Sequence, residues 1–195
     1  LEKLGEKQFW SSTVLFDKKG KENTKFSEAT IDGIVQASFE MGSVKTGALI
    51  VVEQETMLTE YERTGIPLDC IVSRQVLINI FEHNTPLHDG AIIVRGNRIV
   101  SATCYLPLSD NMQISKDLGT RHRAAIGMSE VSDAMIIVVS EETGHVSIAE
   151  GGRLARNVTP EYLRQRINAL QNKELELVNI KKIWKGRKKD ERSTD

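Results

Sequence analysis

The sequence predicts an α/β domain with a central mixed β-sheet flanked by helices. Segments whose apolar residues recur at helical spacing alternate with short, nearly continuous apolar runs, and such runs are typical of strands buried on both faces. Two of the runs are followed at once by a turn and a second strand-like segment, which is the pattern of an antiparallel hairpin. Because buried strands linked by helices occur together with hairpins, the sheet is not expected to be purely parallel.

The first half of the domain is expected to begin with a helix. Ser27 is a good N-cap, and the apolar residues after it keep to one helical face until Gly42. The β-branched run over residues 47–52 predicts a buried strand, and the spacing over residues 74–82 predicts a second helix.

Two hairpins supply further strands. A buried strand over residues 91–95 is joined by a Gly-Asn turn to a partner over residues 98–106. A second buried strand, over residues 134–139, is joined by a turn that contains Thr-Gly to a partner over residues 145–149.

A helix is expected on each side of the second hairpin. The first covers residues 120–131. The second begins at Thr159-Pro160-Glu161, which combines a cap residue, a proline in the first turn and an early acid, and its apolar spacing continues to Leu170.

These elements group into one domain over residues 27–172. Residues 1–26 are mixed and polar and are expected to be a linker, whereas residues 173–195 form a charged C-terminal tail. The tail is expected either to be solvated or to offer a basic surface to anionic lipid or to a partner.

The composition limits the class of protein. The chain has 195 residues, of which 39% are hydrophobic and 27% charged, as in a soluble globular protein. Its 26 basic and 27 acidic residues give a formal net charge of −1, so no overall field draws the chain to nucleic acid or to a membrane. No nucleic-acid partner is expected, and any polyanion must be held locally.

Further features concern the compartment. Cys70 and Cys104 lie in apolar neighbourhoods without metal-ligand spacing and are expected to be buried free thiols of a cytosolic protein. No apolar stretch reaches the roughly 18 residues that indicate a membrane span. The first residue is Leu1 and not Met, which suggests a piece of a longer protein.

The run Asp89-Gly90-Ala91 is the first candidate site. It lies where a loop enters a predicted strand, and ligands often collect at strand ends in α/β sheets. Gly90 and Ala91 have almost no side chain, so a sugar or phosphate could lie against the backbone while Asp89 reaches a metal or a hydroxyl. An ordinary Asp-Gly turn is the alternative. The preceding His88 favours a metal, because imidazole together with carboxylate suits Mn²⁺ or a related ion.

The run Thr120-Arg121-His122-Arg123 is the second candidate site. It lies at a predicted helix N-terminus, where free N–H groups and the helix dipole favour an anion. The arginines can donate in pairs to phosphate oxygens. A solvated basic turn is the alternative.

Two other runs bear on phosphate binding. Gly42 and Gly47 have the glycine spacing of a P-loop, but Ala48-Leu49 follows where Lys and Ser or Thr should stand, so this segment is not expected to hold phosphate as a P-loop does. Ser140-Glu141-Glu142 follows the third buried strand. It is either a hairpin turn or the source of a second carboxylate for a metal.

The motifs DGA at Asp89 to Ala91 and RHR at Arg121 to Arg123 resemble the two signature motifs of the bacterial diadenylate cyclase domain. The likeness extends from about Ser27 to Leu170 and implies the α/β fold of that domain. It also implies a nucleotidyltransferase that joins two ATP molecules into cyclic di-AMP and releases two pyrophosphates. Each 3′-hydroxyl must attack the α-phosphorus of the other ATP in line, so two chains that each hold one ATP must meet head to head as a homodimer.

The resemblance also implies roles for individual residues. Asp89, Arg121 and His122 would be catalytic. The metal ligands would be His88, Asp89 and Glu142, and the metal would be Mn²⁺, with Mg²⁺ or Co²⁺ as alternatives. The residues that would contact ATP are Gly90, Ala91, Tyr105, Leu106, Thr120, Arg121, His122, Arg123, Ser140 and Glu142. Of these, Tyr105 and Leu106 would border the adenine, which rests on the resemblance alone.

The opening residues, Leu1 to Gly5, resemble the linker that follows three membrane helices in the membrane-anchored branch of this family. The resemblance therefore implies the soluble catalytic portion of an enzyme attached at the cytoplasmic face of the cell membrane. Similar members are controlled by a membrane regulator and by a phosphoglucosamine mutase, which are the implied partners.

Two other functions compete with the cyclase. One is a catalytically silent domain that binds nucleotide or senses cyclic di-AMP, but such a relative would be expected to have lost Asp89 or an arginine of the RHR run. The other is metal-dependent ATP hydrolysis, which needs a positioned water in place of the second nucleotide.

Overall fold

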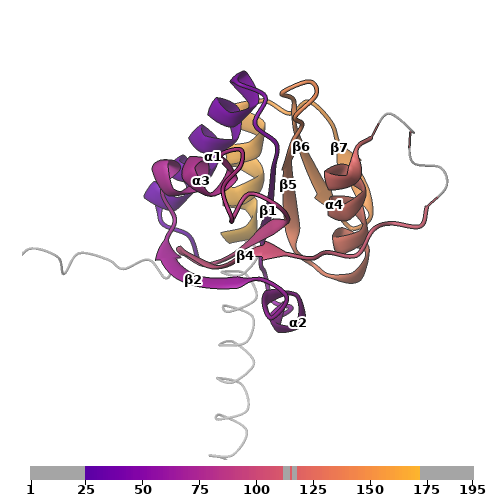
Figure 1. Cartoon of the computed structure of the whole chain (residues 1–195), viewed down its shortest axis with the longest axis horizontal. Coiled ribbons are helices and arrows are strands. Elements are labelled where there is room, and N and C mark those ends of the chain that lie inside the picture. Colours follow the sequence, from indigo (N-terminus) through magenta and orange to yellow (C-terminus); the bar gives the residue numbers. More distant parts are fainter. Residues whose placement is uncertain (1–24, 112–114, 116–117, 172–195) are drawn as a thin grey trace, which may run out of the picture.

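One seven-stranded mixed sheet forms the centre of the molecule (Figure 1). The structure is a computed structural model that describes residues 25–111, 115 and 118–171. The predicted tail over residues 173–195 lies outside the described residues, as does the predicted linker over residues 1–26 apart from its last two residues. The fold is the predicted α/β class with a central mixed sheet.

The elements alternate along the chain in the expected manner. In chain order they are α1 (Glu28–Ser43), β1 (Ala48–Val52), α2 (Thr59–Glu62), β2 (Ile66–Ile71), α3 (Arg74–Phe81), β3 (Ala91–Arg95), β4 (Arg98–Cys104), α4 (Thr120–Val131), β5 (Met135–Val139), β6 (Val146–Glu150) and β7 (Arg153–Ala155). A further helical segment, here called the C-terminal helix, covers residues 160–171 at the end of the described part of the chain.

The predicted helix starts are confirmed. The Ser27 side chain accepts a hydrogen bond from the backbone N–H of Thr30 and so caps α1. Ser73 caps α3 in the same way, by accepting from Val76. Each cap satisfies one of the backbone donors that a helix N-terminus leaves without an internal partner.

The strand order in the sheet is β2-β4-β3-β1-β5-β6-β7. β1 and β3 run parallel, with Ile50 opposite Ile92, and every other neighbouring pair is antiparallel. The hairpins β3–β4 and β5–β6 are the two that the sequence predicts. The sheet is therefore mixed, as expected.

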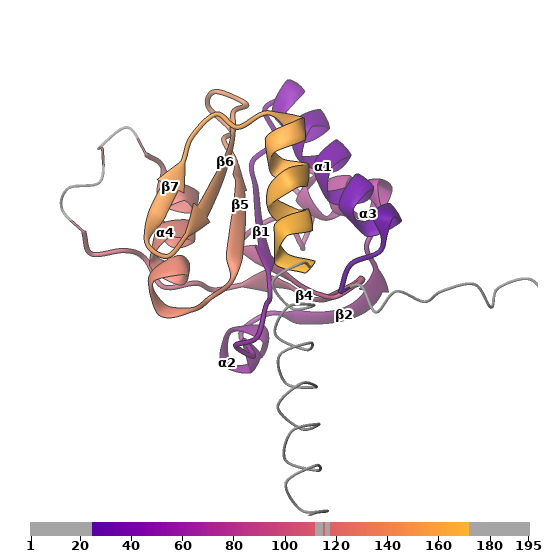
Figure 2. The same ribbon diagram turned by 180° about the vertical axis from the view of Figure 1, so that it is seen from behind.

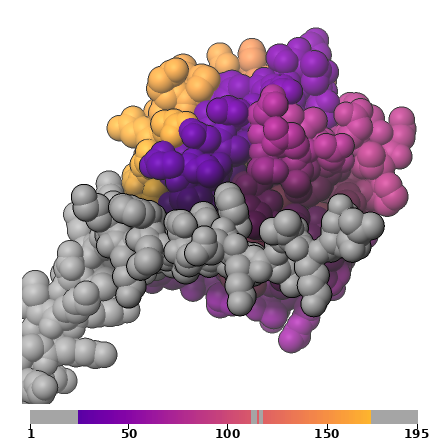
Figure 3. All heavy atoms as spheres, turned by 90° about the vertical axis from the view of Figure 1, so that its left-hand side faces the viewer, coloured from indigo at the N-terminus to yellow at the C-terminus, as the bar shows by residue number. Residues whose placement is uncertain are grey.

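Helices cover both faces of the sheet (Figure 2). On one face, α1, α3 and the C-terminal helix pack on side chains such as Ile50 and Val52, and in Figure 3 α1 lies between the C-terminal helix and the segment that includes α3. On the other face, α4 packs on Leu49 and Val51. Alternate residues of β1 thus face different helices, which explains its continuous apolar run.

Three elements, α2, β2 and β7, are not predicted from the sequence, and the prediction for one cysteine is wrong. Cys104 is buried, as predicted, but Cys70 is only partly buried. It lies on β2, an edge strand with one neighbour and a bulge near Asp69, whose φ is +49°. A strand that is exposed along most of its length has no need for a continuous apolar run.

No helix within the described ranges is both long and apolar enough to cross a membrane.

Candidate nucleotide site

A pocket of about 750 Å³ opens at one end of the central strands of the sheet, on the face that α4 covers. The amino ends of β1 and β3 and the carboxyl ends of β4 and β5 meet there. The pocket is lined by Leu49, Asp89, Gly90, Cys104, Tyr105, Leu106, Leu108, Leu118, Gly119, Thr120, Arg121, His122, Ala124, Val139, Ser140, Glu141, Glu142, Thr143, His145, Ser147, Arg156 and Asn157. The volume is within the range of about 300–1,000 Å³ that is usual for small-molecule sites.

The pocket gathers the two candidate motifs and the acidic turn. Asp89 and Gly90 come from the loop before β3, and Thr120, Arg121 and His122 come from the first turn of α4. Ser140 and Glu142 from the β5–β6 turn, and Tyr105 and Leu106 from the segment after β4, also line it. Most of the site that the sequence predicts is therefore one concave surface.

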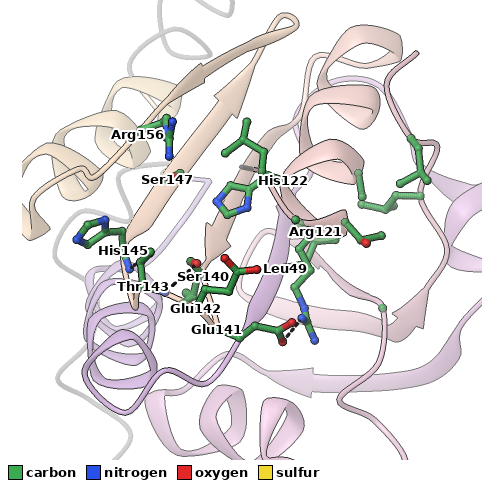
Figure 4. Close-up of a pocket in the computed structure, with 18 of the residues that line it drawn as sticks. Leu49, Arg121, His122, Ser140, Glu141, Glu142, Thr143, His145, Ser147 and Arg156 are labelled. Carbon is green, nitrogen blue, oxygen red and sulfur yellow. Dashed lines mark hydrogen bonds and ion pairs between the residues drawn. The ribbon is translucent and has the colours of Figure 1, made fainter. Parts of the chain in front are cut away.

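The guanidinium of Arg121 forms an ion pair with the carboxylate of Glu141, and both residues line the pocket. Its Nη1 lies 2.5 Å from Oε2 of Glu141 (Figure 4). The Arg121 side chain is 24% exposed and that of Glu141 is 54% exposed. Only one guanidinium nitrogen is used in this pair, so within the described part of the chain the remaining N–H donors are available for phosphate oxygens.

His122 is buried against the wall of the pocket. Burial lowers the pKa of its imidazole below the ordinary 6.5, and the positive charge of Arg156 lowers it further. Glu142 opposes this shift. The shift favours the uncharged imidazole, which can donate or accept a hydrogen bond.

The β5–β6 turn is held by its own first residue. Ser140 Oγ accepts a hydrogen bond from the N–H of Thr143, and the Ser140 carbonyl accepts one from Gly144. The Ser140 N–H donates to the carbonyl of His145. These bonds fix the backbone from which Glu141 and Glu142 project into the pocket.

Gly90 is required by the backbone beside Asp89. Its φ is +101°, and a Cβ there would lie 2.9 Å from the carbonyl carbon of Thr103. Thr103 itself has a φ of +60°, which is unusual for a β-branched residue, and it lies at a bulge where the β3–β4 register shifts. The bulge and the glycine together bring the Asp89 backbone close to the end of β4.

Three predicted site residues do not line the pocket. His88 Nδ1 is 2.6 Å from the carbonyl oxygen of Thr85, and Ala91 is fully buried in β3. Arg123 points elsewhere and donates from Nη2 to the carbonyl of Ser109 at 3.0 Å. The chain thus uses the last arginine of the RHR run to hold a neighbouring segment.

Glu141 and Arg156 are the charged pocket residues that sequence reasoning did not assign to the site. Glu141 was visible as one of two acids in the turn after β5. Arg156 follows β7, a strand of three residues that the sequence did not predict, so no signal placed it near the site. Its side chain makes no hydrogen bond or ion pair within the described residues.

The predicted metal ligands do not form a cluster on their own. No group of three or more His, Cys, Asp or Glu side chains in the described ranges is placed to hold one ion. Asp89 and Glu142 do line the same pocket, whereas His88 does not. Carboxylate oxygens are donors that Mg²⁺ and Mn²⁺ accept, so the donor chemistry fits a divalent cation whose other ligands come from phosphate.

A pocket at the ends of the central strands, beside a helix N-terminus that carries an arginine and a histidine, is typical of a nucleotide-binding α/β domain. Residues 35–154 match the family model DAC, described as DisA bacterial checkpoint controller nucleotide-binding. The chain belongs to this family.

The relatives are consistent with that assignment. The chain is 45% identical over 189 residues to the cyclic di-AMP synthase CdaA of Bacillus subtilis, a match that covers 96% of this chain and 67% of the relative. It is 47% identical over 181 residues to a diadenylate cyclase of Listeria monocytogenes, covering 90% and 65% of the two chains. The chain thus spans about two thirds of the length of these curated relatives.

Solved structures share the fold. A double mutant of DacA from Staphylococcus aureus aligns with a TM-score of 0.71 and 47% identity, over 73% of this chain and 95% of that one. A hypothetical membrane spanning protein from Bacillus cereus aligns with a TM-score of 0.65 and 45% identity, over 69% and 65%.

Proposed function

We propose that the chain is the catalytic portion of a diadenylate cyclase, which joins two ATP molecules into cyclic di-AMP. The observation that carries the proposal is that Asp89 and Arg121, from motifs about thirty residues apart, line one pocket in a chain of this family. Relatives named as diadenylate cyclases or cyclic di-AMP synthases, at 45% and 47% identity, support it.

In the proposed reaction, the 3′-oxygen of each ATP attacks the α-phosphorus of the other. A P–O bond forms there, the bond to the β-phosphate oxygen breaks, and pyrophosphate leaves. Asp89 orients the ribose hydroxyl and accepts its proton. Thr120 and Arg121, at the N-terminus of α4, bind the outer phosphates and stabilise the charge that develops on the leaving group.

Arg156 is a second phosphate-binding group in this proposal. Arg121 is partly neutralised by Glu141 at 2.5 Å, and burial lowers the pKa of His122, which favours its uncharged form. Arg156 lines the same pocket without an ion-pair partner in the described part of the chain. Within the described part of the chain, Arg156 is therefore the pocket cation whose charge is least neutralised by a neighbouring carboxylate, and it is available to a polyphosphate. It lies just beyond residues 35–154, which the family model matches.

The charge of the pocket favours a divalent metal as cofactor. Carboxylates outnumber guanidiniums three to two among its lining residues: Asp89, Glu141 and Glu142 against Arg121 and Arg156. A triphosphate would add further negative charge. When bound, a divalent cation would neutralise the phosphates and the developing charge at phosphorus. We propose Mn²⁺, with Mg²⁺ or Co²⁺ as alternatives, on Asp89 and Glu142; His88 offers only Nε2, since Nδ1 faces Thr85.

The proposal requires two copies of the chain to meet head to head. The family resemblance implies one ATP in each chain, so in this proposal the second ATP comes on a partner. Two apolar residues at the pocket, Tyr105 and Leu108, are 71% and 51% exposed. Large exposed apolar side chains beside a ligand pocket are typical of an interface.

We also propose that the whole protein is anchored at the cytoplasmic face of the cell membrane. The resemblance of residues 1–5 to a membrane-proximal linker supports this, as does the description of the Bacillus cereus neighbour as a hypothetical membrane spanning protein. The membrane regulator and the phosphoglucosamine mutase remain proposals that rest on resemblance.

Dilution tests the proposed function against hydrolysis. Cyclic di-AMP and ADP are quantified by chromatography while the chain is diluted at fixed ATP and Mn²⁺. The cyclase rate per subunit should fall once the concentration drops below the dissociation constant of the dimer, because the reaction needs two loaded subunits. Turnover to ADP at a rate per subunit that does not change with dilution would contradict the proposal.

A further inference from the structure

The segment from Gly42 to Gly47 covers the end of α1 and the turn before β1 and has the glycine spacing of a P-loop, yet none of its residues lines the pocket. Its glycines instead contact the structures that carry the pocket's charged groups. Gly47 lies under the Arg121–Glu141 pair, and Gly42 lies against the β5–β6 turn.

Gly47 leaves room for the ion pair. A Cβ at this position would lie 2.9 Å from Nη1 and 3.0 Å from Cζ of Arg121, and 3.0 Å from Oε2 of Glu141. Separations of that size are shorter than carbon atoms tolerate against a guanidinium or carboxylate. The guanidinium and its partner carboxylate therefore occupy the space that a side chain at position 47 would fill, and they pack against the backbone of Gly47.

Gly42 contacts the β5–β6 turn, which carries Glu141, the ion-pair partner of Arg121. A Cβ on Gly42 would collide with the carbonyl oxygen of Gly144, and a Cβ on Gly144 would collide with the carbonyl oxygen of Gly42. This reciprocal backbone contact seats the β5–β6 turn against the end of α1. Glu141 projects from that turn, so the position of the carboxylate that pairs with Arg121 depends on the contact.

We propose that Gly47 is a positioning residue that sets the orientation of the Arg121 guanidinium toward the phosphates of bound nucleotide. The proposal rests on the proposed function, because it assigns Arg121 to the triphosphate. In this proposal the P-loop-like segment does not bind phosphate through its own backbone N–H groups. It contributes indirectly, because Gly47 positions Arg121, an arginine of α4 that binds the phosphates.

Gly47→Ala is a selective probe of this relationship. Two of the three nearest atoms belong to the far end of the Arg121 side chain and the third belongs to Glu141. The backbone of Gly47 does not need a positive φ, so the alanine can be accommodated by moving those side chains. The variant should fold normally and hold Arg121 in the wrong place.

The experiment measures binding of adenosine 5′-(α,β-methylene)triphosphate, which cannot lose pyrophosphate, by calorimetry in the presence of Mn²⁺. Wild type, Gly47→Ala, Arg121→Ala and the double variant are compared in a double-mutant cycle. Gly47→Ala should raise the Kd about five- to tenfold, as expected for a weakened charged hydrogen bond. In the Arg121→Ala background, adding Gly47→Ala should change the Kd by less than about twofold.

The outcomes separate the two proposals. Wild type that does not bind the analogue overturns the nucleotide site and this inference with it. Wild type that binds, with Gly47→Ala binding equally well, overturns the inference alone. An equal loss of affinity from Gly47→Ala in both backgrounds, or an unfolded variant in both, also overturns it, because the effect would then not pass through Arg121.

Discussion

Arg123 and Ser109 are joined by reciprocal hydrogen bonds. Arg123 donates from Nη2 to the Ser109 carbonyl at 3.0 Å, and the Ser109 N–H donates to the Arg123 carbonyl at 3.1 Å. Ser109 Oγ also donates to Glu130 at 2.7 Å. Gly127 of α4 allows the backbone of Ser109 to approach closely, because a Cβ at Gly127 would lie 2.6 Å from the Ser109 nitrogen. The segment that leads from Tyr105 to Ser109 is therefore held on α4.

Arg123→Ala is expected to lower the free energy of unfolding by about 1 kcal/mol, the usual value of one partly exposed hydrogen bond. The affinity of the folded variant for the ATP analogue should fall less than about twofold. Chemical denaturation and calorimetry give the two values. A loss of affinity as large as that of Arg121→Ala, with unchanged stability, would show that Arg123 contacts ATP, as the family resemblance implies.

Asp89→Asn is expected to leave ATP binding largely intact and to abolish turnover. The amide keeps the size of the side chain but cannot accept the hydroxyl proton or hold a cation well, and both contributions matter mainly in the transition state. Turnover and Kd are measured separately. Asp110→Asn is the matched control, because Asp110 is exposed and does not line the pocket. Wild-type turnover in Asp89→Asn would contradict the assignment.

Arg156→Ala is expected to raise the Kd of the ATP analogue about tenfold, as the loss of one charge-assisted phosphate contact should. Arg153→Ala, which removes an exposed arginine of β7 outside the pocket, serves as the control and should bind normally. Equal affinities for the two variants would show that Arg156 does not contact the phosphates.

The stability of the protein should fall as the pH drops below about 6.5, because of His122. Burial and Arg156 lower the pKa of its imidazole in the folded state. Between the ordinary pKa of 6.5 and the lowered one, the unfolded chain binds more protons, so protonation favours unfolding. Above this window the group contributes nothing.

Denaturation of wild type and His122→Asn at pH 7.5 and pH 5 measures this contribution. The wild type should lose more stability between the two pH values than the variant does, because the asparagine does not titrate. Equal losses would show that the imidazole is protonated as easily in the folded protein as in the unfolded chain.

The core of the fold could be predicted because both faces of the inner strands are covered. Residues 47–52 and 134–139 are continuous apolar runs, since α1 and the C-terminal helix cover one face and α4 covers the other. β2 and β7 lie at the two edges of the sheet. Their burial is incomplete, so neither edge strand has a periodic signal that a sequence can reveal.

The candidate site could be predicted in part for a related reason. Asp89, Arg121 and His122 lie in runs whose residue types are unusual together, and the structure brings them to one pocket. Arg156 is distant from these runs and reaches the pocket only through the path of β7. Arg123 has the right charge for phosphate, but its guanidinium donates to the backbone carbonyl of Ser109. That contact depends on tertiary packing, so the sequence alone does not predict it. The sequence does not reveal the role of Gly47 either, because its contact with Arg121 depends on how α4 packs beside β1.

The most direct measurement is the identity of the product formed from ATP. The chain is incubated with ATP and Mn²⁺, with and without a chelator, and the products are separated by chromatography next to the Asp89→Asn variant. The account predicts metal-dependent cyclic di-AMP and pyrophosphate from the wild type and neither from the variant. ADP alone, or ATP that stays unaltered at concentrations where the chain is a dimer, would contradict it.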